Sequence, residues 1–146
     1  DAEIVQSLVK HGIKKVVTST AIGKALIDSK RLPRKLVQSV SASTAIGDDS
    51  VAMRLIPFDG VVRGGGAVVV LPTQKVLFAG PFVVNGPWTR LAASDTHRWV
   101  ETLRQLEKAG ATHIIPGFGS WGGAEILARQ KLYLVELRRQ VGWVIA

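Results

Sequence analysis

The side chains with the most obvious capacity for chemistry are three histidines in a chain that contains no cysteine. Histidine can serve as a general base or a metal ligand because it changes charge near neutral pH. Here each one also has a structural explanation. His11 ends an expected helix, where the helix dipole favours a cation, and His97 follows Asp95 at the start of another, which indicates a capping cluster. His113 begins a short strand, and we interpret it as structural.

Two glycine-rich segments are the other candidates for chemistry: "RGGG" at 63–66 and "PGFGSWGGAE" at 116–125. Backbone N–H groups in such segments can hold a phosphate, above all where a helix follows. The first segment lacks the Gly-Lys-Ser/Thr ending of a P-loop, and the chain has no G-x-S-x-G elbow. We therefore interpret both segments as loops in which glycine permits a positive φ.

The elements that would position these residues alternate between helix and strand. Apolar periodicity, N-cap residues and helix-ending glycines predict helices over 2–11, 21–29, 96–109 and 124–145, with a short helical piece over 33–40. Short apolar runs predict strands over 13–18, 51–58, 67–71, 75–79 and 112–115, and a polar stretch predicts a loop over 39–50. This order indicates an α/β fold in which one mixed sheet has helices on one side. The length of 146 residues suits one domain with its own core.

The strands 67–71 and 75–79 form the centre of this prediction. The turn at Pro72–Gln74 joins them into a hairpin, and both arms are almost entirely apolar. A strand with one wet face should alternate between apolar and polar residues, and these do not. We therefore expect both faces of the hairpin to be covered.

The residues around the hairpin resemble those of a known family. The segments "AVVVLPTQKVLFAGPFVVNG" and "HRWVETLRQLEKAGATHIIPGFGS" are similar to the C-terminal half of metallo-β-lactamase-fold hydrolases. In that half a "VVxLPxxKVLFxGD" hairpin precedes a helix and "HxxPGHG", and "YLVELRRQV" resembles the closing helix. The resemblance implies that 1–146 is a single truncated domain, half of an αββα sandwich. The free face of its sheet would normally meet the sheet of the other half.

The resemblance also implies a one- or two-metal site, commonly zinc, whose bound water hydrolyses the substrate. Matched position by position, the family's ligands are absent. No HxHxDH motif occurs, and Val62, Pro81 and Phe118 stand where the family has a histidine, the "GD" aspartate and the "PGHG" histidine. None of these three side chains can bind a metal. We therefore expect no metal, no other cofactor and no family hydrolysis.

The strands keep their apolar residues although the matched region covers only half a sandwich. An exposed face of that size would exceed the few hundred Å² that soluble monomers tolerate. We therefore expect a homo-oligomer, with a two-fold dimer favoured. Plain core packing is the simpler interpretation of four aromatic residues that could instead line an apolar interface or pocket: Phe82, Trp88, Phe118 and Trp121.

The net charge of +8 suits an anionic partner or an ordinary solvated surface. The basic residues are scattered along the sequence, with pairs at Lys14–Lys15, Lys30–Arg31, Arg34–Lys35 and Arg138–Arg139. No nucleic-acid motif accompanies them. No apolar run is long enough to cross a bilayer, so we expect no membrane partner. The leading hypothesis is a non-catalytic, metal-free half-domain that acts through self-assembly or small-ligand binding. The alternatives are a hydrolase completed by a partner chain and a basic nucleic-acid-binding module.

Overall fold

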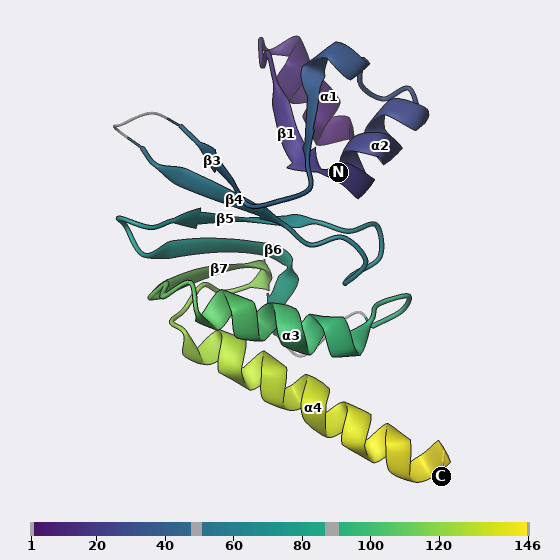
Figure 1. Ribbon diagram of the computed structural model, residues 1–146, viewed down its shortest axis with the longest axis vertical. Helices are drawn as coiled ribbons and strands as arrows, with labels where there is room; N and C mark the ends of the chain where they lie inside the picture. Colours follow the sequence, from purple (N-terminus) through teal and green to yellow (C-terminus); the bar gives the residue numbers. More distant parts are fainter. Residues whose placement is uncertain (1, 48–50, 87–90, 146) are drawn as a thin grey trace.

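The computed structural model describes residues 2–47, 51–86 and 91–145 (Figure 1). The helices are α1 (Ala2–Lys10), α2 (Thr20–Asp28), α3 (Thr96–Glu107) and α4 (Glu125–Ile145), with a short 3₁₀ helix, η1 (Arg34–Leu36). The strands are β1 (Val16–Ser19), β2 (Val37–Val40), β3 (Thr44–Ile46), β4 (Met53–Pro57), β5 (Ala67–Leu71), β6 (Val76–Asn85) and β7 (His113–Gly119). The expected α/β order is therefore present.

Residues 2–40 form a small N-terminal unit at the end of the molecule opposite the C-terminus (Figure 1). Its strands β1 and β2 pair in parallel, with Val16 opposite Val37, and α2 is the crossover between them. Ser19 caps α2 by accepting a hydrogen bond from the N–H of Ile22, as expected for serine at this position. The Gln6 side chain of α1 donates to the carbonyl of Arg31 at 3.2 Å and so ties α1 to the segment that follows α2.

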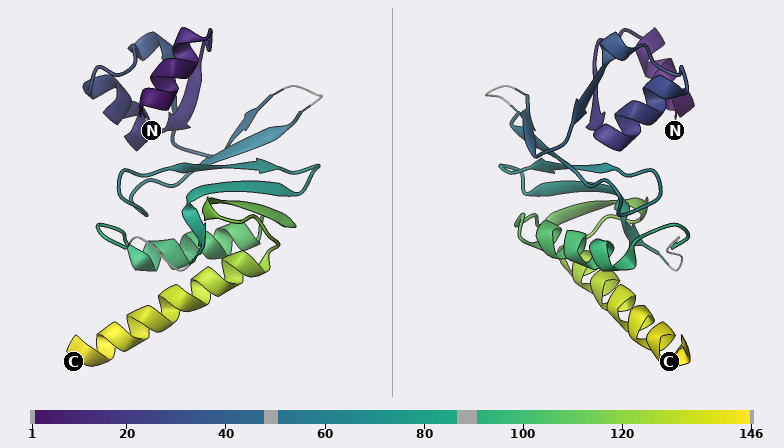
Figure 2. Two further views of the ribbon diagram at one scale, coloured as in Figure 1. Left: turned by 180° about the vertical axis from the view of Figure 1, so that it is seen from behind. Right: turned by 45° about the vertical axis from the view of Figure 1, so that its right-hand side comes forward.

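The main sheet has five strands in the order β3-β4-β5-β6-β7. Neighbouring strands are antiparallel except β6 and β7, which are parallel because α3 carries the chain back between them. The register places Val70, Leu77 and Ile114 in one row that faces the helices and is buried. Helices α3 and α4 cover this face, and α4 extends beyond α3 toward the C-terminus (Figure 2). The expected mixed sheet with helices on one side is confirmed.

The core lies between this face and the two helices. Its fully buried members include Val68, Leu77, Phe82, Val83, Trp99, Leu103, Leu106, Ile114, Ile126, Leu127 and Leu134. Two polar side chains join the helices to β6 inside this core. The indole of Trp99 donates to the carbonyl of Phe82 at 2.7 Å, and the Gln130 amide donates to the same carbonyl at 3.1 Å. The Gln130 side chain also accepts from the N–H of Val84 at 2.7 Å, so the oxygen and the nitrogen of the Gln130 amide both fix helix α4 to β6.

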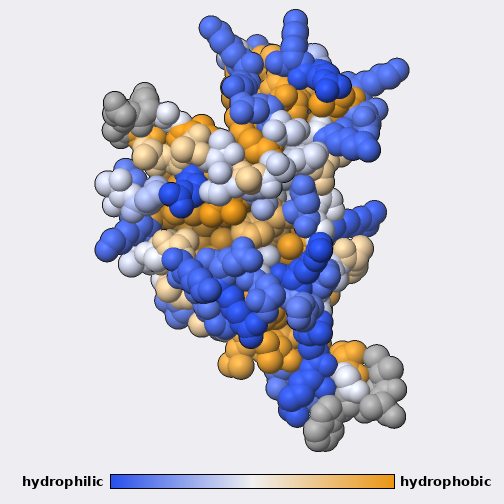
Figure 3. All heavy atoms as spheres, in the orientation of Figure 1, coloured by the Kyte–Doolittle hydropathy of each residue, from blue (hydrophilic) through white to orange (hydrophobic). Residues whose placement is uncertain are grey.

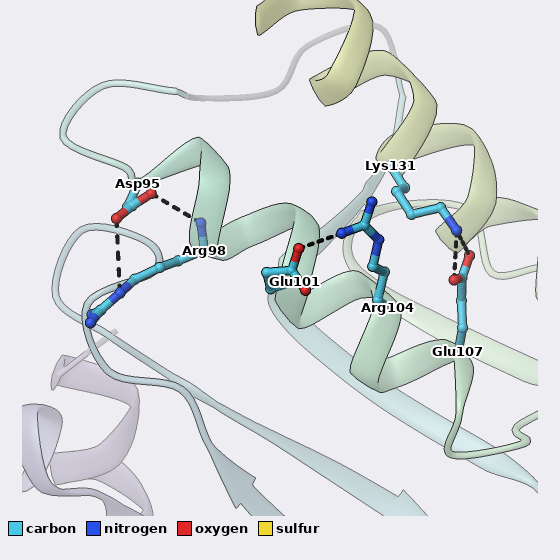
Figure 4. A network of polar contacts seen from close by, with 6 residues as sticks. All are labelled: Asp95, Arg98, Glu101, Arg104, Glu107 and Lys131. Carbon is cyan, nitrogen blue, oxygen red and sulfur yellow. Dashed lines mark hydrogen bonds and ion pairs between the residues drawn. The ribbon is translucent and has the colours of Figure 1, made fainter.

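Charged pairs accompany the packing of α3 against α4 (Figure 4). Lys131 contacts both carboxylate oxygens of Glu107, at 2.6 and 2.7 Å, and joins the two helices. The other pairs in the figure lie within α3 and its cap and are more exposed, so each contributes little to stability. Asp95 is the N-cap of α3, and its carboxylate accepts a hydrogen bond from the backbone N–H of Arg98. This bond holds the pKa of the Asp95 carboxyl below its usual value.

Two segments have a different structure from the one predicted, and two strands are longer than predicted. The helical piece expected over 33–40 is only the single turn η1, after which Val37–Val40 pairs with β1 as strand β2. The loop expected over 39–50 contains the end of β2 and strand β3, which pairs with β4. Both segments are too short to show a periodicity of their own, and each becomes a strand because another strand satisfies its backbone, β1 for β2 and the next strand β4 for β3.

The strands predicted over 75–79 and 112–115 continue to Asn85 and Gly119 as β6 and β7. The interpretation of the glycine-rich segment 116–125 as a loop is therefore wrong for residues 116–119, which pair with β6.

The second face of the main sheet is only partly covered by the described part of the chain. Leu55, Val69, Phe78 and Ile115 form a row across four strands on this face. Leu55 is buried, whereas Phe78 is 42% and Ile115 37% exposed. The expectation that both faces of the hairpin are covered is therefore wrong for the chain by itself. Burial alternates along β5 although the sequence does not, so apolar side chains reach the surface.

Candidate functional site

Three segments meet at one edge of the main sheet: the loop 58–66, the middle of β6 around Gly80 and Pro81, and the end of β7. Gly80 has a φ of +50° and lies at an irregularity of the β6–β7 pairing, which places Pro81 at a bend of β6. Pro81 is exposed. A side chain added at Gly66 would meet Pro81 at 3.2 Å, and one added at Gly117 would strike the backbone of Gly80. Both close approaches require glycine and bring the loop and β7 against the bend.

The two other family ligand positions lie in these same segments. Val62 is buried, and its carbonyl accepts from the N–H of Gly65 at 2.9 Å to close a turn in the loop. Phe118 of β7 pairs with Val84 of β6 and is 62% exposed. The structure therefore gathers the segments that hold Val62, Pro81 and Phe118 at one edge of the sheet, with one side chain in the core and two at the surface.

This edge does not fit the metal site that the fold implies. A transition metal needs nitrogen, oxygen or sulfur donors, and the side chains of valine, proline and phenylalanine supply none. Across the described residues, no three His, Cys, Asp or Glu side chains are grouped closely enough to hold a metal ion. We derive no catalytic step through a metal at these positions.

A polar cluster that the sequence did not predict lies beside Phe118. Arg129 of α4 donates to the Asn85 side chain at 2.6 Å, and Asn85 donates to the carbonyl of Ser120 at 2.7 Å. The close fit of Gly119 against the Asn85 backbone places this cluster next to Phe118. The Arg129 guanidinium is permanently charged and the Asn85 amide is neutral. Such a pair attracts anions, but it provides neither a nucleophile nor a group that transfers protons. No local sequence signal indicates this cluster, because Asn85 and Arg129 lie 44 residues apart.

The four aromatic residues expected at an interface or pocket occupy different environments. Phe82 is fully buried, with its ring edge-on to Phe58 at a centroid distance of 5.4 Å. Trp121 is 68% exposed and stacks on His113 at 6.1 Å. Phe118 is exposed as described above, and Trp88 lies outside the described residues. An apolar hollow of about 250 Å³ is lined instead by α1, α2 and Gly64.

The histidines lie on separate elements, as their spacing indicated. His11 follows α1, and its Nδ1 bonds to the carbonyl of Ser7 at 2.8 Å. His97 lies in the first turn of α3, whose cap is Asp95, so the capping interpretation of this pair is confirmed. Their arrangement with His113 on β7 suggests no shared acid–base chemistry.

Comparison with known proteins identifies the fold. Neither protein-family models nor curated protein sequences gave a match. Among solved structures, the metallo-β-lactamase from Pontibacter korlensis is similar with a TM-score of 0.75 and 22% identity, over 89% of this chain and 61% of that one. The VMB-1 structure gives 0.70 and 18%, over 85% and 57% of the two chains. The DIM-1 metallo-β-lactamase gives 0.68 and 22%, over 84% and 58%.

The chain therefore has part of the metallo-β-lactamase fold, as the sequence resemblance implied. It spans about three-fifths of the length of the structures that it matches. Within the described residues, none of the helices combines the length and the apolar character that a membrane crossing requires.

Proposed function

We propose that this chain is a non-catalytic form of the metallo-β-lactamase fold and that it works by association of two copies. The observation that carries the proposal is the replacement of metal donors by Val62, Pro81 and Phe118 at an otherwise preserved sheet edge. A bend, a tight glycine contact and a turn remain there, so the backbone frame of a site is kept while its donors are absent. Function resides in site residues and not in the frame.

The open face of the main sheet is the surface proposed for the contact between copies. Besides the row that ends in Phe78 and Ile115, the half-buried Leu71 and Val76 lie next to each other across β5 and β6. Apolar side chains that reach the surface together are typical of a protein–protein contact. A two-fold axis brings the same residues of both copies together, so a single apolar row can cover itself.

The test is the mass of the protein in solution, measured by light scattering after size-exclusion chromatography. We expect a concentration-dependent dimer. Phe78→Glu should raise its dissociation constant by more than about tenfold, because the carboxylate would be desolvated without a partner. Leu132→Glu is the matched control, since Leu132 is 68% exposed on α4 and away from the sheet. A wild-type monomer at all concentrations, or equal effects of the two variants, would contradict the proposed dimer.

The proposal that the chain is non-catalytic has its own test. Calorimetric titration of the purified protein with Zn²⁺ should give less than one equivalent of bound metal. One or more tightly bound equivalents would show that donors assemble elsewhere. That result would favour the alternative of a hydrolase completed by a partner chain.

A further inference from the structure

The basic residues of the N-terminal unit gather at one end, although they are scattered along the sequence. Because β1 and β2 are parallel and Val16 lies opposite Val37, the residues just before the two strands are neighbours. Lys14 and Lys15 precede β1, and Arg34 and Lys35 lie in the turn that leads into β2. Four cations from two segments 20 residues apart therefore meet at the same end of this small sheet.

The two helices add more positive charge to the same end. A crossover helix runs antiparallel to the strands that it connects, so α2 finishes beside the start of β2, where Lys30 and Arg31 follow it. Helix α1 finishes at Lys10, and the N–H of Ile13 still bonds to the carbonyl of Leu8 at 3.3 Å in the turn toward β1. We call these seven residues the basic end: Lys10, Lys14, Lys15, Lys30, Arg31, Arg34 and Lys35.

Little negative charge offsets the basic end. Residues 2–40 contain eight Lys and Arg but only two carboxylates, Glu3 and Asp28. Glu3 lies in the first turn of α1, at the other end of that helix, whereas Asp28 is the last residue of α2 and lies at the basic end itself. One carboxylate therefore stands among seven cations there. All seven side chains of the basic end are exposed. Figure 3 shows long hydrophilic side chains projecting in several directions from this end of the molecule.

We propose that the basic end binds the phosphate backbone of double-stranded nucleic acid without reading its sequence. The first 57 residues contain no Phe, Tyr or Trp, so this end lacks the large aromatic side chains on which single-stranded bases commonly stack. Lys and Arg side chains bind phosphates by charge, and duplex DNA carries one charge per about 1.7 Å of its axis. Cations that project in several directions (Figure 3) can reach phosphates on both sides of a groove. A flat bilayer would contact only those on one plane.

The proposal concerns a surface separate from the sheet face, so it stands or falls independently of the proposed dimer. Its test is the anisotropy of a labelled 20-base-pair DNA duplex, titrated with the full chain at several NaCl concentrations. If all seven cations contact phosphates, affinity should fall roughly 10³- to 10⁴-fold between 50 and 200 mM salt, because each phosphate contributes about 0.9 logarithmic units per tenfold rise in salt. Duplexes of different sequence should bind alike. A flat salt dependence, or an affinity that follows the base sequence, would overturn the proposal.

Charge-removal variants locate the site. The quadruple change K14Q/K15Q/R34Q/K35Q should reduce the fall in affinity over the same salt range to about 40-fold, because only three contacts remain. K14Q/K15Q and R34Q/K35Q made separately guard against misfolding of the quadruple variant. The control is K75Q/K108Q, which removes two exposed charges from the turn between β5 and β6 and from the end of α3. Equal effects of the control and either double variant would contradict the assignment to the basic end.

A vesicle experiment distinguishes the other polyanion. Leu8 and Ile13 are 45% and 39% exposed and lie among the lysines, so an anionic bilayer is the alternative partner. Sedimentation with vesicles of phosphatidylcholine alone, or with phosphatidylglycerol added, measures this directly. Binding to anionic vesicles that Leu8→Ser abolishes, together with no binding to duplex DNA, would overturn the proposal in favour of lipid.

Discussion

Gln130 offers the sharpest test of how the sheet edge is held in place. Its side chain is 5% exposed and bonds to two backbone groups of β6, at Val84 and Phe82. The change Gln130→Leu keeps the size of the side chain but removes both bonds. Val84 would lose the acceptor of its N–H, whereas the Phe82 carbonyl would keep the Trp99 indole. A lost hydrogen bond costs about 1 kcal/mol, and a buried group left without a partner costs about 1–3 kcal/mol.

We therefore expect Gln130→Leu to lower the free energy of unfolding by about 2–4 kcal/mol. The measurement is urea denaturation followed by circular dichroism, with Gln105→Leu as the control, since Gln105 is exposed on α3. Combining Gln130→Leu with Trp99→Phe removes both donors from the Phe82 carbonyl. The double variant should then lose about 1 kcal/mol more than the sum of the two single changes. Strict additivity, or equal effects of the two Gln→Leu changes, would refute the role of Gln130 as a bridge.

Three further predictions test the close contacts, a cap and one titration. Gly117→Ala should destabilise the fold by about 1–3 kcal/mol or more, measured by thermal unfolding, because the added methyl group strikes the backbone of β6. Gly142→Ala is the control: its methyl group lies in open space, and it should stabilise α4 by up to about 1 kcal/mol. Ser19→Ala should cost about 1 kcal/mol through loss of the α2 cap, and an unchanged urea midpoint would contradict that role. The Arg139 guanidinium is the main cause that lowers the pKa of Glu136 to about 2, so carboxyl NMR should find this value in the wild type and a rise toward 4.5 in Arg139→Gln.

The Glu136 prediction also fixes the direction of a pH effect. A carboxyl whose pKa is lower in the folded state stabilises the fold above its unfolded pKa of about 4.5. That contribution disappears as the pH falls from about 4.5 through about 2, where the folded carboxyl also takes up its proton. Since this pair is exposed, added salt should weaken the effect. If the free energy of unfolding falls between pH 4.5 and pH 2 by the same amount in the wild type and in Arg139→Gln, this account is contradicted.

Local signals in the sequence were sufficient for most of the fold. Asp95 and Ser19 are the side chains that cap α3 and α2, and the "LPTQKV" turn joins β5 to β6. Such signals act over a few residues and therefore survive in the sequence by itself. Segments 37–40 and 44–46 were missed as strands because their partners lie elsewhere in the chain.

The candidate site divides in the same way. The identities of Val62, Pro81 and Phe118 excluded metal donors at the family positions before any geometry was known. The sequence could not indicate the cluster of Asn85 with Arg129, since a contact across 44 residues depends on how α4 packs against β6. It also left both an apolar pocket or interface and the core open for Phe82, and the side chain is fully buried, because the bend at Gly80 decides which face of the strand each later residue takes.

The amino-acid sequence by itself determined which chemistry the chain carries: side chains without metal donors at the family positions, apolar strands and an excess of positive charge. These properties belong to residues one at a time and need no neighbours. Only the tertiary structure decided where they act. The pairing register turned single apolar residues into a row across the sheet, and the parallel strands β1 and β2 brought separate lysines and arginines to one end. Surfaces arise from residues distant in sequence, so their shape and charge follow from the path of the chain.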